Sequence, residues 1–253
     1  MTSSIPFIGT AGWSIPPRHA PEFPGSGSHL ARYAEIFHGV EINSSFHRPH
    51  RRSTYERWAA SVPPEFRFSV KAPRSITHER RLVDVAEALD VFLAEIGGLG
   101  SKLGPLLVQL PPSLAFERAT VEGFIATLRE RFAGSVACEP RHASWFTEAA
   151  DACLNENRVA RVAADPARAP EAAHPDGWPG LAYYRLHGSP QIYRSSYARE
   201  YLDELAPLLA RESASGAETW CIFDNTAAQA ATENALAIRE HAALAPARRR
   251  HPG

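Results

Sequence analysis

Short apolar runs alternate with longer amphipathic segments along most of the chain. Eight runs rich in β-branched and aromatic residues predict strands. They begin near Phe7, Val40, Phe66, Leu106, Val136, Val159, Ala182 and Thr219. Between them, apolar side chains recur at helical spacing over residues 28–38, 53–60, 82–96, 120–132, 146–155, 196–211 and 227–243. The pattern therefore predicts a regular alternation of strands and helices.

Polar residues and glycines mark the ends of several predicted helices. Ser28 is expected to cap the first helix, Gly97 and Gly98 to close the third, and Gly134 to end the fourth. The connection after Asp165 differs, because its sequence PARAPEAAHPDGWPG holds four prolines and two glycines. We therefore expect the sixth helix to be reduced or replaced by a loop.

Alternating strands and helices favour parallel strands joined by right-handed crossovers. Eight repeats fit a closed barrel better than an open doubly wound sheet, the alternative arrangement. The first strand is followed by GTAGW, which lacks the GxGxxG spacing, and the sequence has no P-loop. We predict one α/β domain, a single (β/α)8 TIM-type barrel over residues 1–244, followed by a frayed basic tail over residues 245–253.

The composition is that of a globular protein without a dominant charge. The 253 residues are 44% hydrophobic and 22% charged, enough for one large core. The formal net charge is −1, from 27 basic and 28 acidic residues. No global field therefore attracts this chain to nucleic acid or to an anionic membrane, although a local basic cleft is compatible with these numbers.

Cysteine usage and the N-terminal segment predict the compartment. The three cysteines, Cys138, Cys153 and Cys221, show no metal-binding spacing and are expected to be buried thiols in a reducing compartment. The N-terminus has neither the charged region nor the apolar run of a signal peptide, and no stretch is long and apolar enough to span a bilayer. We expect a cytoplasmic protein without a membrane partner.

Charged and amide side chains share one face, late in seven of the eight predicted strands. They are Glu41, Asn43, Lys71, Gln109, Glu139, Arg141, Asp165, Arg185, His187 and Asp224. Unpaired charges inside a barrel are very costly, and barrel enzymes keep their active sites at the C-terminal ends of the strands. The pattern therefore predicts a functional site. The structural alternative is a buried salt-bridge network that pairs Glu41, Glu139, Asp165 and Asp224 with Lys71, Arg141 and Arg185.

Other residues near the strand ends are weaker candidates. His187 precedes Gly188, where a ligand could approach the backbone closely. His142 has the opposite parity to Arg141, so it faces either a helix or the loop, and His78 lies on the loop after the third strand. Trp13, Phe46 and Trp145 follow strand ends and would form either a stacking wall or a hydrophobic lid.

Seven motifs in order resemble the YecE-like family, also called DUF72. They are GTAGW at Gly9, VEINSSF at Val40, FSVKAP…ITH at Phe68, LVQLPPS at Leu107, EPRHASW at Glu139, YRLHG at Tyr184 and FDNTAAQAATENA at Phe223. Each motif is weak alone, but the ordered set is specific and covers nearly the whole chain. The resemblance implies a (β/α)8-type barrel whose reaction is not established.

The resemblance also implies a shared polar set. Its members are Glu41, Asn43, Lys71, His78, Gln109, Glu139, Arg141, His142, Trp145, Arg185, His187 and Asn225. This chain departs from the family pattern at two places: Ile15 replaces a tyrosine, and Asp224-Asn225 replaces a pair of asparagines. The first change puts a tyrosine contact at the mouth in doubt, and the second adds a carboxylate that could alter charge or metal preference.

The leading hypothesis is an enzyme that acts on an anionic small molecule or a phosphate ester. Lys71, Arg141 and Arg185 would bind the anion, because guanidinium groups clamp phosphate and carboxylate. Glu139 or Glu41 would be the general base, and His187 the general acid or orienting group. Hydrolase, lyase and isomerase chemistry all stay open. A desolvated Lys71 could also form a Schiff base, whereas Lys102 lies outside a strand.

Three other hypotheses stay open from the sequence. A metal-dependent phosphodiesterase acting on nucleic acid would use Glu41, Glu139, Asp165, His187 and Asp224 as ligands, and it alone requires a cofactor, a divalent metal. The cations among the central residues count against it. A glycoside hydrolase would use Glu41 and Glu139. A non-catalytic binding barrel would keep the anion clamp and lack an acid–base pair.

Overall fold

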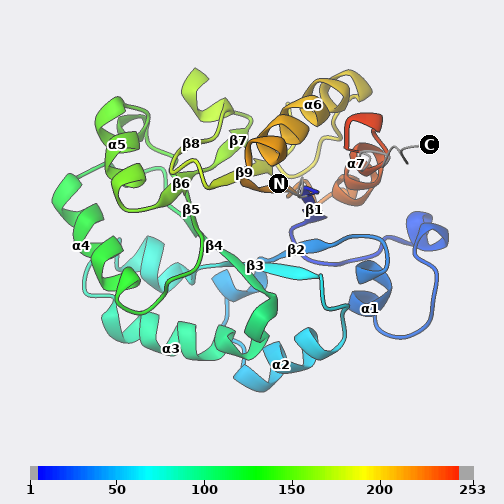
Figure 1. The fold of residues 1–253 in the computed structure, drawn as a ribbon, viewed down its shortest axis with the longest axis horizontal. Coiled ribbons are helices and arrows are strands. Elements are labelled where there is room, and N and C mark those ends of the chain that lie inside the picture. Colours follow the sequence, from blue (N-terminus) through cyan, green and yellow to red (C-terminus); the bar gives the residue numbers. More distant parts are fainter. Residues whose placement is uncertain (1–4, 245–253) are drawn as a thin grey trace, which may run out of the picture.

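The computed structural model describes residues 5–244, with strands at the centre and helices around them (Figure 1). The strands are β1 (Phe7–Thr10), β2 (Gly39–Ile42), β3 (Arg67–Lys71), β4 (Leu103–Gln109), β5 (Val136–Glu139), β6 (Val159–Arg161), β7 (Ala163–Asp165), β8 (Asp176–Gly177), β9 (Leu181–Leu186) and β10 (Glu218–Phe223). The α-helices are α1 (His29–Ala34), α2 (Arg52–Ala60), α3 (Ala86–Ile96), α4 (Arg118–Arg129), α5 (Glu148–Glu156), α6 (Arg199–Ser215) and α7 (Ala230–Arg239). Short 3-10 or π segments are η1 (Pro17–Glu22), η2 (Ser44–Phe46), η3 (Ser75–Glu79), η4 (Gly97–Lys102), η5 (Ala143–Trp145), η6 (Pro170–Ala173) and η7 (Ala242–Leu244).

Hydrogen bonding divides the strands into two sheets. One has the order β1-β10-β9-β7, and the other has the order β2-β3-β4-β5-β6-β8. Every strand pair is parallel except β6 with β8. The predicted α/β class with parallel strands is therefore confirmed.

The two sheets meet at two seams instead of forming one closed cylinder. At the first seam, a single bridge joins Ala11 to Glu41, and the Gly12 amide donates to the Glu41 carbonyl at 2.8 Å. At the second, only Val162 separates β6, which pairs with β5, from β7, which pairs with β9. Both seams involve strands of three or four residues, and each of these strands pairs along its whole length with its neighbour on the other side. The hydrogen-bonded sheets therefore do not confirm a complete closed (β/α)8 barrel.

Helix ends agree with the sequence in part. Ser28 caps α1, and Gly97 ends α3, as predicted. That helix begins at Ala86 instead of residue 82, because three residues within 81–84 have positive φ. The predicted C-cap at Gly134 is wrong, since α4 ends before it. Between β7 and β9 the described chain forms only η6 and β8, in agreement with the proline-rich sequence there.

Two apolar clusters form the core. The larger one lies between strands and helices and includes the three cysteines, which are free and buried as expected. The smaller one contains Leu107, Ala137, Ala160, Val162, Leu181, Tyr183, Trp220 and Ile222. Trp220 stacks on Phe7 with ring centroids 4.7 Å apart. Because alternate strand residues share a face, this inner cluster lies one layer below residues two positions later, such as Arg185 after Tyr183.

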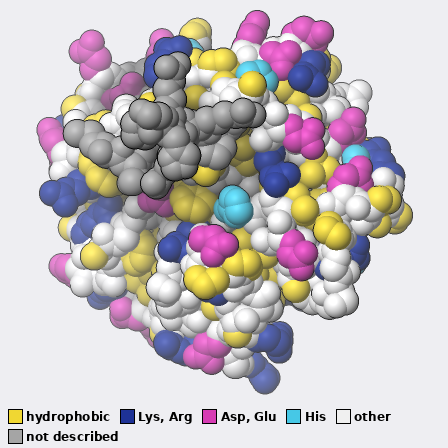
Figure 2. Space-filling model, turned by 45° about the vertical axis from the view of Figure 1, so that its right-hand side comes forward, with side chains coloured by type: hydrophobic (Ala, Val, Ile, Leu, Met, Phe, Trp, Pro, Cys, Tyr) yellow, Lys and Arg dark blue, Asp and Glu magenta, His cyan; other side chains and the backbone are white. Residues whose placement is uncertain are grey.

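The surface carries mixed charge. Figure 2 shows basic and acidic side chains interspersed over the visible face, as the near-zero net charge predicts. Within residues 5–244, no helix is both long enough and apolar enough to cross a bilayer. The predicted basic tail at 245–253 lies outside the described residues.

Candidate functional site

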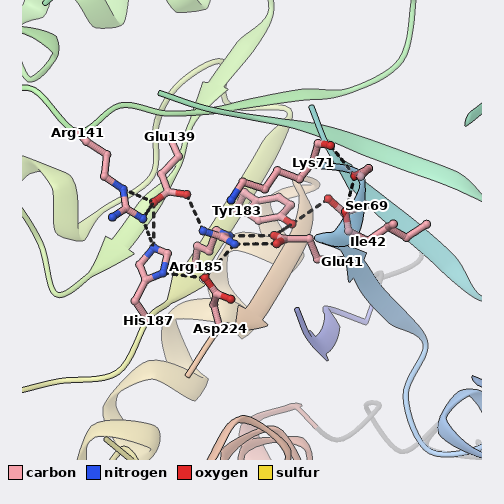
Figure 3. A network of polar contacts seen from close by, with 11 residues as sticks. Glu41, Ile42, Ser69, Lys71, Glu139, Arg141, Tyr183, Arg185, His187 and Asp224 are labelled. Atoms are coloured by element: carbon pink, nitrogen blue, oxygen red, sulfur yellow. Dashed lines mark hydrogen bonds and ion pairs between the residues drawn. The ribbon is translucent and has the colours of Figure 1, made fainter. Parts of the chain in front are cut away.

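Polar side chains from both sheets converge above the inner apolar cluster (Figure 3). They project from the C-terminal ends of β2, β3, β5, β9 and β10 or from the first two residues beyond these strands. The central members are Glu41, Lys71, Glu139, Arg141, Arg185, His187 and Asp224, which we call the central network. The alternation of polar and apolar positions in the sequence predicted all seven on one face. The structure brings them together.

Arg185 is the hub of the central network. Its Nε and Nη2 contact both oxygens of Glu41 at 3.0 and 2.8 Å, and its Nη1 lies 3.1 Å from Glu139 Oε2. A third carboxylate follows, with Asp224 Oδ2 at 2.9 Å from Nη2. The Arg185 and Glu41 side chains are fully buried. All three guanidinium nitrogens therefore face carboxylates of the protein, and the predicted role of Arg185 in an anion clamp is replaced by a role as counter-charge.

Arg185 also connects the two sheets. Glu41 and Glu139 belong to the six-stranded sheet, whereas Arg185 and Asp224 belong to the end of the four-stranded one. The backbone ladder between the sheets is sparse at the β1–β2 seam. The ion pairs of Arg185 therefore link elements that few backbone hydrogen bonds hold together.

His187 lies between two carboxylates and an arginine. Its Nδ1 is 3.0 Å from Asp224 Oδ2, and its Nε2 is 2.9 Å from Glu139 Oε1. Nε2 is also 3.1 Å from Arg141 Nη2. A protonated Nε2 can donate to Glu139, and an unprotonated Nε2 can accept from Arg141. Both protonation states of this nitrogen therefore have a partner in the same geometry.

Two buried carboxylates of the network are held in the ionised form. Burial alone would raise the pKa of Glu139, but the charges of Arg185, His187 and Arg141 outweigh it and hold this pKa well below its usual value. For Asp224, burial is likewise outweighed by Arg185 and His187, and its pKa is lowered. Glu139 is therefore a weak base in this state, and the sequence-based choice of Glu139 as general base loses support.

Lys71 reaches the network from β3 without joining its ion pairs. Its side chain is 6% exposed, and Nζ lies 4.1 Å from the centroid of the Phe46 ring. Burial and the neighbouring charge of Arg185 lower the pKa of Lys71 to about 8, against an opposing effect of Glu41, Glu139 and Asp224. Lys71 is therefore partly unprotonated near neutral pH.

Three further predicted residues surround this centre. The His78 ring packs edge-on against Phe46 with centroids 4.9 Å apart, and burial together with the Lys71 charge lowers its pKa. Gln109 is buried and pairs in register with Glu139. Asn43 follows β2, and its buried Oδ1 has no hydrogen-bond partner within the described chain. None of the three has an ion pair with the central network within the described chain.

Asp165 does not join the network. Its Oδ1 accepts a hydrogen bond of 2.8 Å from the Tyr197 hydroxyl, on the side of β7 that faces α6. Val162 belongs to the inner apolar cluster, so Asp165, three residues later, has the opposite parity. The prediction that Asp165 shares the central face is corrected for this reason.

Four other candidates have structural contacts elsewhere. His142 Nδ1 accepts from the Ser144 amide and caps η5. Trp145 is buried in the outer core, and its Nε1 donates to the Leu114 carbonyl. Trp13 packs edge-on against Trp58 with centroids 4.9 Å apart, and Asn225 Nδ2 donates to the Ser195 carbonyl and to Asn234. Trp13, Phe46 and Trp145, expected to form either a stacking wall or a hydrophobic lid, have different partners, and of the three Phe46 lies beside Lys71.

Two tyrosines of the site were missed in the sequence. The buried Tyr183 hydroxyl donates to Glu41 at 3.0 Å and lies 2.8 Å from the Ser69 hydroxyl. Tyr183 precedes Arg185 by two residues in the same strand, so the alternation of side chains could have placed it on the same face. The Tyr193 ring packs edge-on against His187 with centroids 5.7 Å apart, from a loop residue with φ of 69°. No pattern in the sequence indicates that contact.

The side chains of the described central network are not arranged as a metal site. Among residues 5–244, no group of three or more His, Cys, Asp or Glu side chains is arranged to hold a metal ion. The carboxylates of the second hypothesis are paired with arginine, and Asp165 lies on another face. Glu41 and Glu139 bind the same guanidinium, so neither is placed as a free glycosidase carboxyl.

Acidification should weaken folding through Glu139 and Asp224. Because their pKa values are lowered in the folded protein, their contribution is complete above the ordinary values of 4.5 and 3.8 and is lost as pH falls below them. Each unit by which folding lowers a carboxyl pKa adds about 1.4 kcal/mol to the free energy of unfolding. We expect the free energy of unfolding, measured in urea from pH 7 to pH 3, to fall steeply below about pH 4.5.

Glu139→Gln should flatten this acid slope, because the amide does not titrate. The matched control is Glu122→Gln, at an exposed ion pair with Arg118. It should leave the slope close to that of the wild type. Equal slopes in the wild type and Glu139→Gln would contradict the assignment.

Comparison with known families and structures agrees with this architecture. The sequence model of the family described as protein of unknown function DUF72 matches residues 7–252. The UPF0759 protein YunF of Bacillus subtilis is 28% identical over 149 residues, which cover 56% of this chain and 52% of that protein. The UPF0759 protein YecE of Escherichia coli is 27% identical over 144 residues, 56% of this chain and 50% of that one. The chain thus spans about half the length of the curated relatives it matches.

Two solved structures are similar over nearly the whole chain. A DUF72 family protein of Thermotoga maritima gives a TM-score of 0.77 at 26% identity and covers 93% of this chain and 98% of its own. A DUF72 family protein of Enterococcus faecalis gives a TM-score of 0.76 at 22% identity, covering 91% and 93%. The second likeness bears on the fold alone.

Proposed function

This chain belongs to the DUF72 family, whose function is unknown, and we propose that it is an enzyme that moves a proton on an anionic small molecule or phosphate ester. We also propose that its two sheets act as one (β/α)8 unit, in which β6 and β7 fill a single strand position. The chemistry is assigned to the C-terminal ends of the strands, where such units bind substrates.

The geometry of His187 carries the proposal. Asp224 fixes the ring through Nδ1, and Nε2 faces an acceptor on Glu139 and a donor on Arg141. A general acid–base group needs a held ring and a nitrogen that tolerates both protonation states. His187 is therefore the proposed acid–base residue, in place of the two glutamates considered from the sequence.

Arg141 is the proposed anion-binding group. Arg141 keeps 11% of its side chain exposed, whereas Arg185 and Glu41 have none. A hollow beside it is lined by Glu139, Arg141 and His187 together with Arg168 of the loop after β7. An incoming phosphate or carboxylate could take donors of Arg141 that now contact Glu139.

A binding protein without catalysis is the second candidate. The observation in its favour is that Arg185 already pairs the carboxylates of Glu41, Glu139 and Asp224. Such a self-contained network can be purely structural, as the sequence-based alternative stated. The two candidates share the anion site and differ in whether His187 exchanges a proton with the bound molecule.

The anion site is tested by thermal unfolding in the presence of phosphorylated and carboxylated metabolites. We expect at least one compound to raise the midpoint, since a ligand at 100 times its Kd stabilises the folded state by about 2.7 kcal/mol. Arg141→Gln should weaken that compound's binding about tenfold or more, through loss of a charged hydrogen-bond donor. Arg118→Gln, at an exposed pair, should bind normally.

The outcomes separate the proposals. If no anion stabilises the protein, or Arg141→Gln binds as well as the wild type, the anion site is refuted. With a bound compound in hand, His187→Gln should keep binding and lose about 100-fold or more of turnover. Undiminished turnover in His187→Gln would refute the acid–base role, and binding without any turnover in the wild type would favour the binding protein.

A further inference from the structure

Lys71 is a buried amine without a carboxylate partner in contact. Within residues 5–244, no hydrogen bond or ion pair engages its Nζ, which lies over the face of Phe46 at 4.1 Å from the ring centroid. The other lysine of the chain, Lys102, donates to the carbonyls of Ala59 and Val62 at 2.6 and 2.5 Å. One lysine is thus held by backbone acceptors, and the other is not.

The charges around Lys71 come from four strands. Arg185 of β9 disfavours a second cation, while Glu41, Glu139 and Asp224 favour one. His78 faces it from η3, across the same Phe46 ring. Burial or a neighbouring cation activates amine nucleophiles in enzymes, and Lys71 has both. The same environment would suit a general base, but an amine that no carboxylate or carbonyl engages can also attack a carbonyl carbon.

We propose that Lys71 attacks the carbonyl carbon of an anionic oxo-compound, an oxo acid or a phosphorylated aldehyde or ketone, and forms a Schiff base with it. The inference rests on the proposed function, because Arg141 would hold the anionic group while Nζ reaches the carbonyl. It narrows the substrate class from anions in general to anions that carry a carbonyl group.

The step balances without a redox partner. The lone pair of the neutral amine forms the C–N bond, the carbonyl π electrons move to oxygen, and a proton passes from nitrogen to that oxygen to give a carbinolamine. Protonation of the hydroxyl by His187 then releases water, and the nitrogen lone pair forms the C=N bond of an iminium ion. The cation lies among Glu41, Glu139 and Asp224, the carboxylates that already act on the charge of Lys71.

The test is reductive trapping with a known oxo acid. The full-length protein is incubated with pyruvate and sodium cyanoborohydride, and the reduced adduct is located by peptide mass spectrometry. We expect the adduct on Lys71 and not on Lys102, the only other lysine. Between pH 6 and pH 7 its initial rate should rise about tenfold, because the amine fraction rises tenfold per pH unit below the pKa. The rise should level off near pH 8.

Several outcomes would overturn the inference. They are preferential labelling of Lys102, no adduct on Lys71, or a rate on Lys71 that keeps rising tenfold per pH unit beyond pH 9. The wild-type profile needs no variant, so a misfolded Lys71→Met would not obscure it. In a folded Lys71→Met the adduct should vanish, while Lys102→Met should keep it.

Uncharged butanone, a ketone like pyruvate, separates this inference from the proposed function. Trapping of pyruvate on Lys71 well above that of butanone, reduced at least tenfold by Arg141→Gln, supports both. Equal trapping of the two compounds refutes the anion site and keeps Lys71 as nucleophile. Stabilisation by oxo acids without any adduct on Lys71 refutes the Schiff base and keeps the anion site.

Discussion

Arg185→Met is expected to cost at least about 3–5 kcal/mol of folding free energy and to leave much of the protein unfolded at neutral pH. The substitution keeps most of the side-chain volume but removes the cation that pairs with Glu41, Glu139 and Asp224. Breaking a buried pair at one end leaves an uncompensated charge, and here three carboxylates lose a partner. Circular dichroism and urea unfolding measure the loss.

The matched control for this variant is Arg118→Met. Arg118 also pairs with two carboxylates, Glu122 and Glu156, but its side chain is 48% exposed. Its loss should cost at most about 1 kcal/mol. The deficit of Arg185→Met should shrink on mild acidification, because the stranded carboxyls then have raised pKa values in the folded state and become neutral as pH falls through them. Comparable losses in the two variants would contradict the hub role of Arg185.

Trp220→Ala is expected to destabilise the protein by about 3–5 kcal/mol, the usual cost of emptying a large buried aromatic site. Trp220 is fully buried, stacks on Phe7, and lies 6.1 Å from the ring of Tyr183, which holds Glu41. Its six-membered ring also fills the space opposite Gly104. The cavity would therefore open directly under the central network. Chemical denaturation gives the free energy, and binding of an anion found by thermal unfolding gives the effect on the site.

Two substitutions serve as controls for the tryptophan. Trp220→Phe keeps an aromatic ring and loses the hydrogen bond of 2.9 Å from Nε1 to Glu218, so it should cost clearly less than the alanine variant. Trp178→Ala removes a tryptophan that is only partly buried against the same cluster and should also cost less. If Trp178→Ala lowered the free energy of unfolding as much as Trp220→Ala, the larger contribution expected of the fully buried Trp220 would be contradicted.

The composition of the central network was readable from the sequence because it depends on local geometry. Side chains alternate along a strand, so Tyr183, Arg185 and His187 must share one face wherever β9 lies. Parallel strands place their C-terminal ends together, which brings Glu41 and Glu139 to the same region. Neither step requires knowledge of which strands pair.

The sequence-based predictions failed where contacts between residues distant in the sequence determine the structure. Asp165 was assigned by its position late in a strand, but the parity set by Val162 places it on the α6 side. Arg161 shares that outer parity and is fully buried against Asp151, a pair that no local pattern indicates. Whether β1 pairs with β2 along its length depends on how closely two short strands approach, and a single bridge at Ala11 is the result.

Which cations of the network are already paired could be learned only from the structure. Three cations were grouped as one anion clamp in the sequence, since residue type alone does not reveal which charges are already satisfied. The structure separates Arg185, enclosed by carboxylates, from Arg141 at the rim and from Lys71 over Phe46. Each of the three cations therefore has a different proposed role, and variants can test these roles separately.

The linkage of the two sheets through Arg185 has a consequence for folding cooperativity. A fluctuation that opens the β1–β2 seam must also separate Glu41 of β2 from the guanidinium on β9, so the sheets should not open independently. Slowly exchanging amides of β2 and β9 should then share one opening free energy and merge with global unfolding. In Arg185→Met the amides of β2 and those of β9 should show two different opening free energies. Arg185 and its carboxylate partners should thereby make the two sheets behave as one cooperative unit.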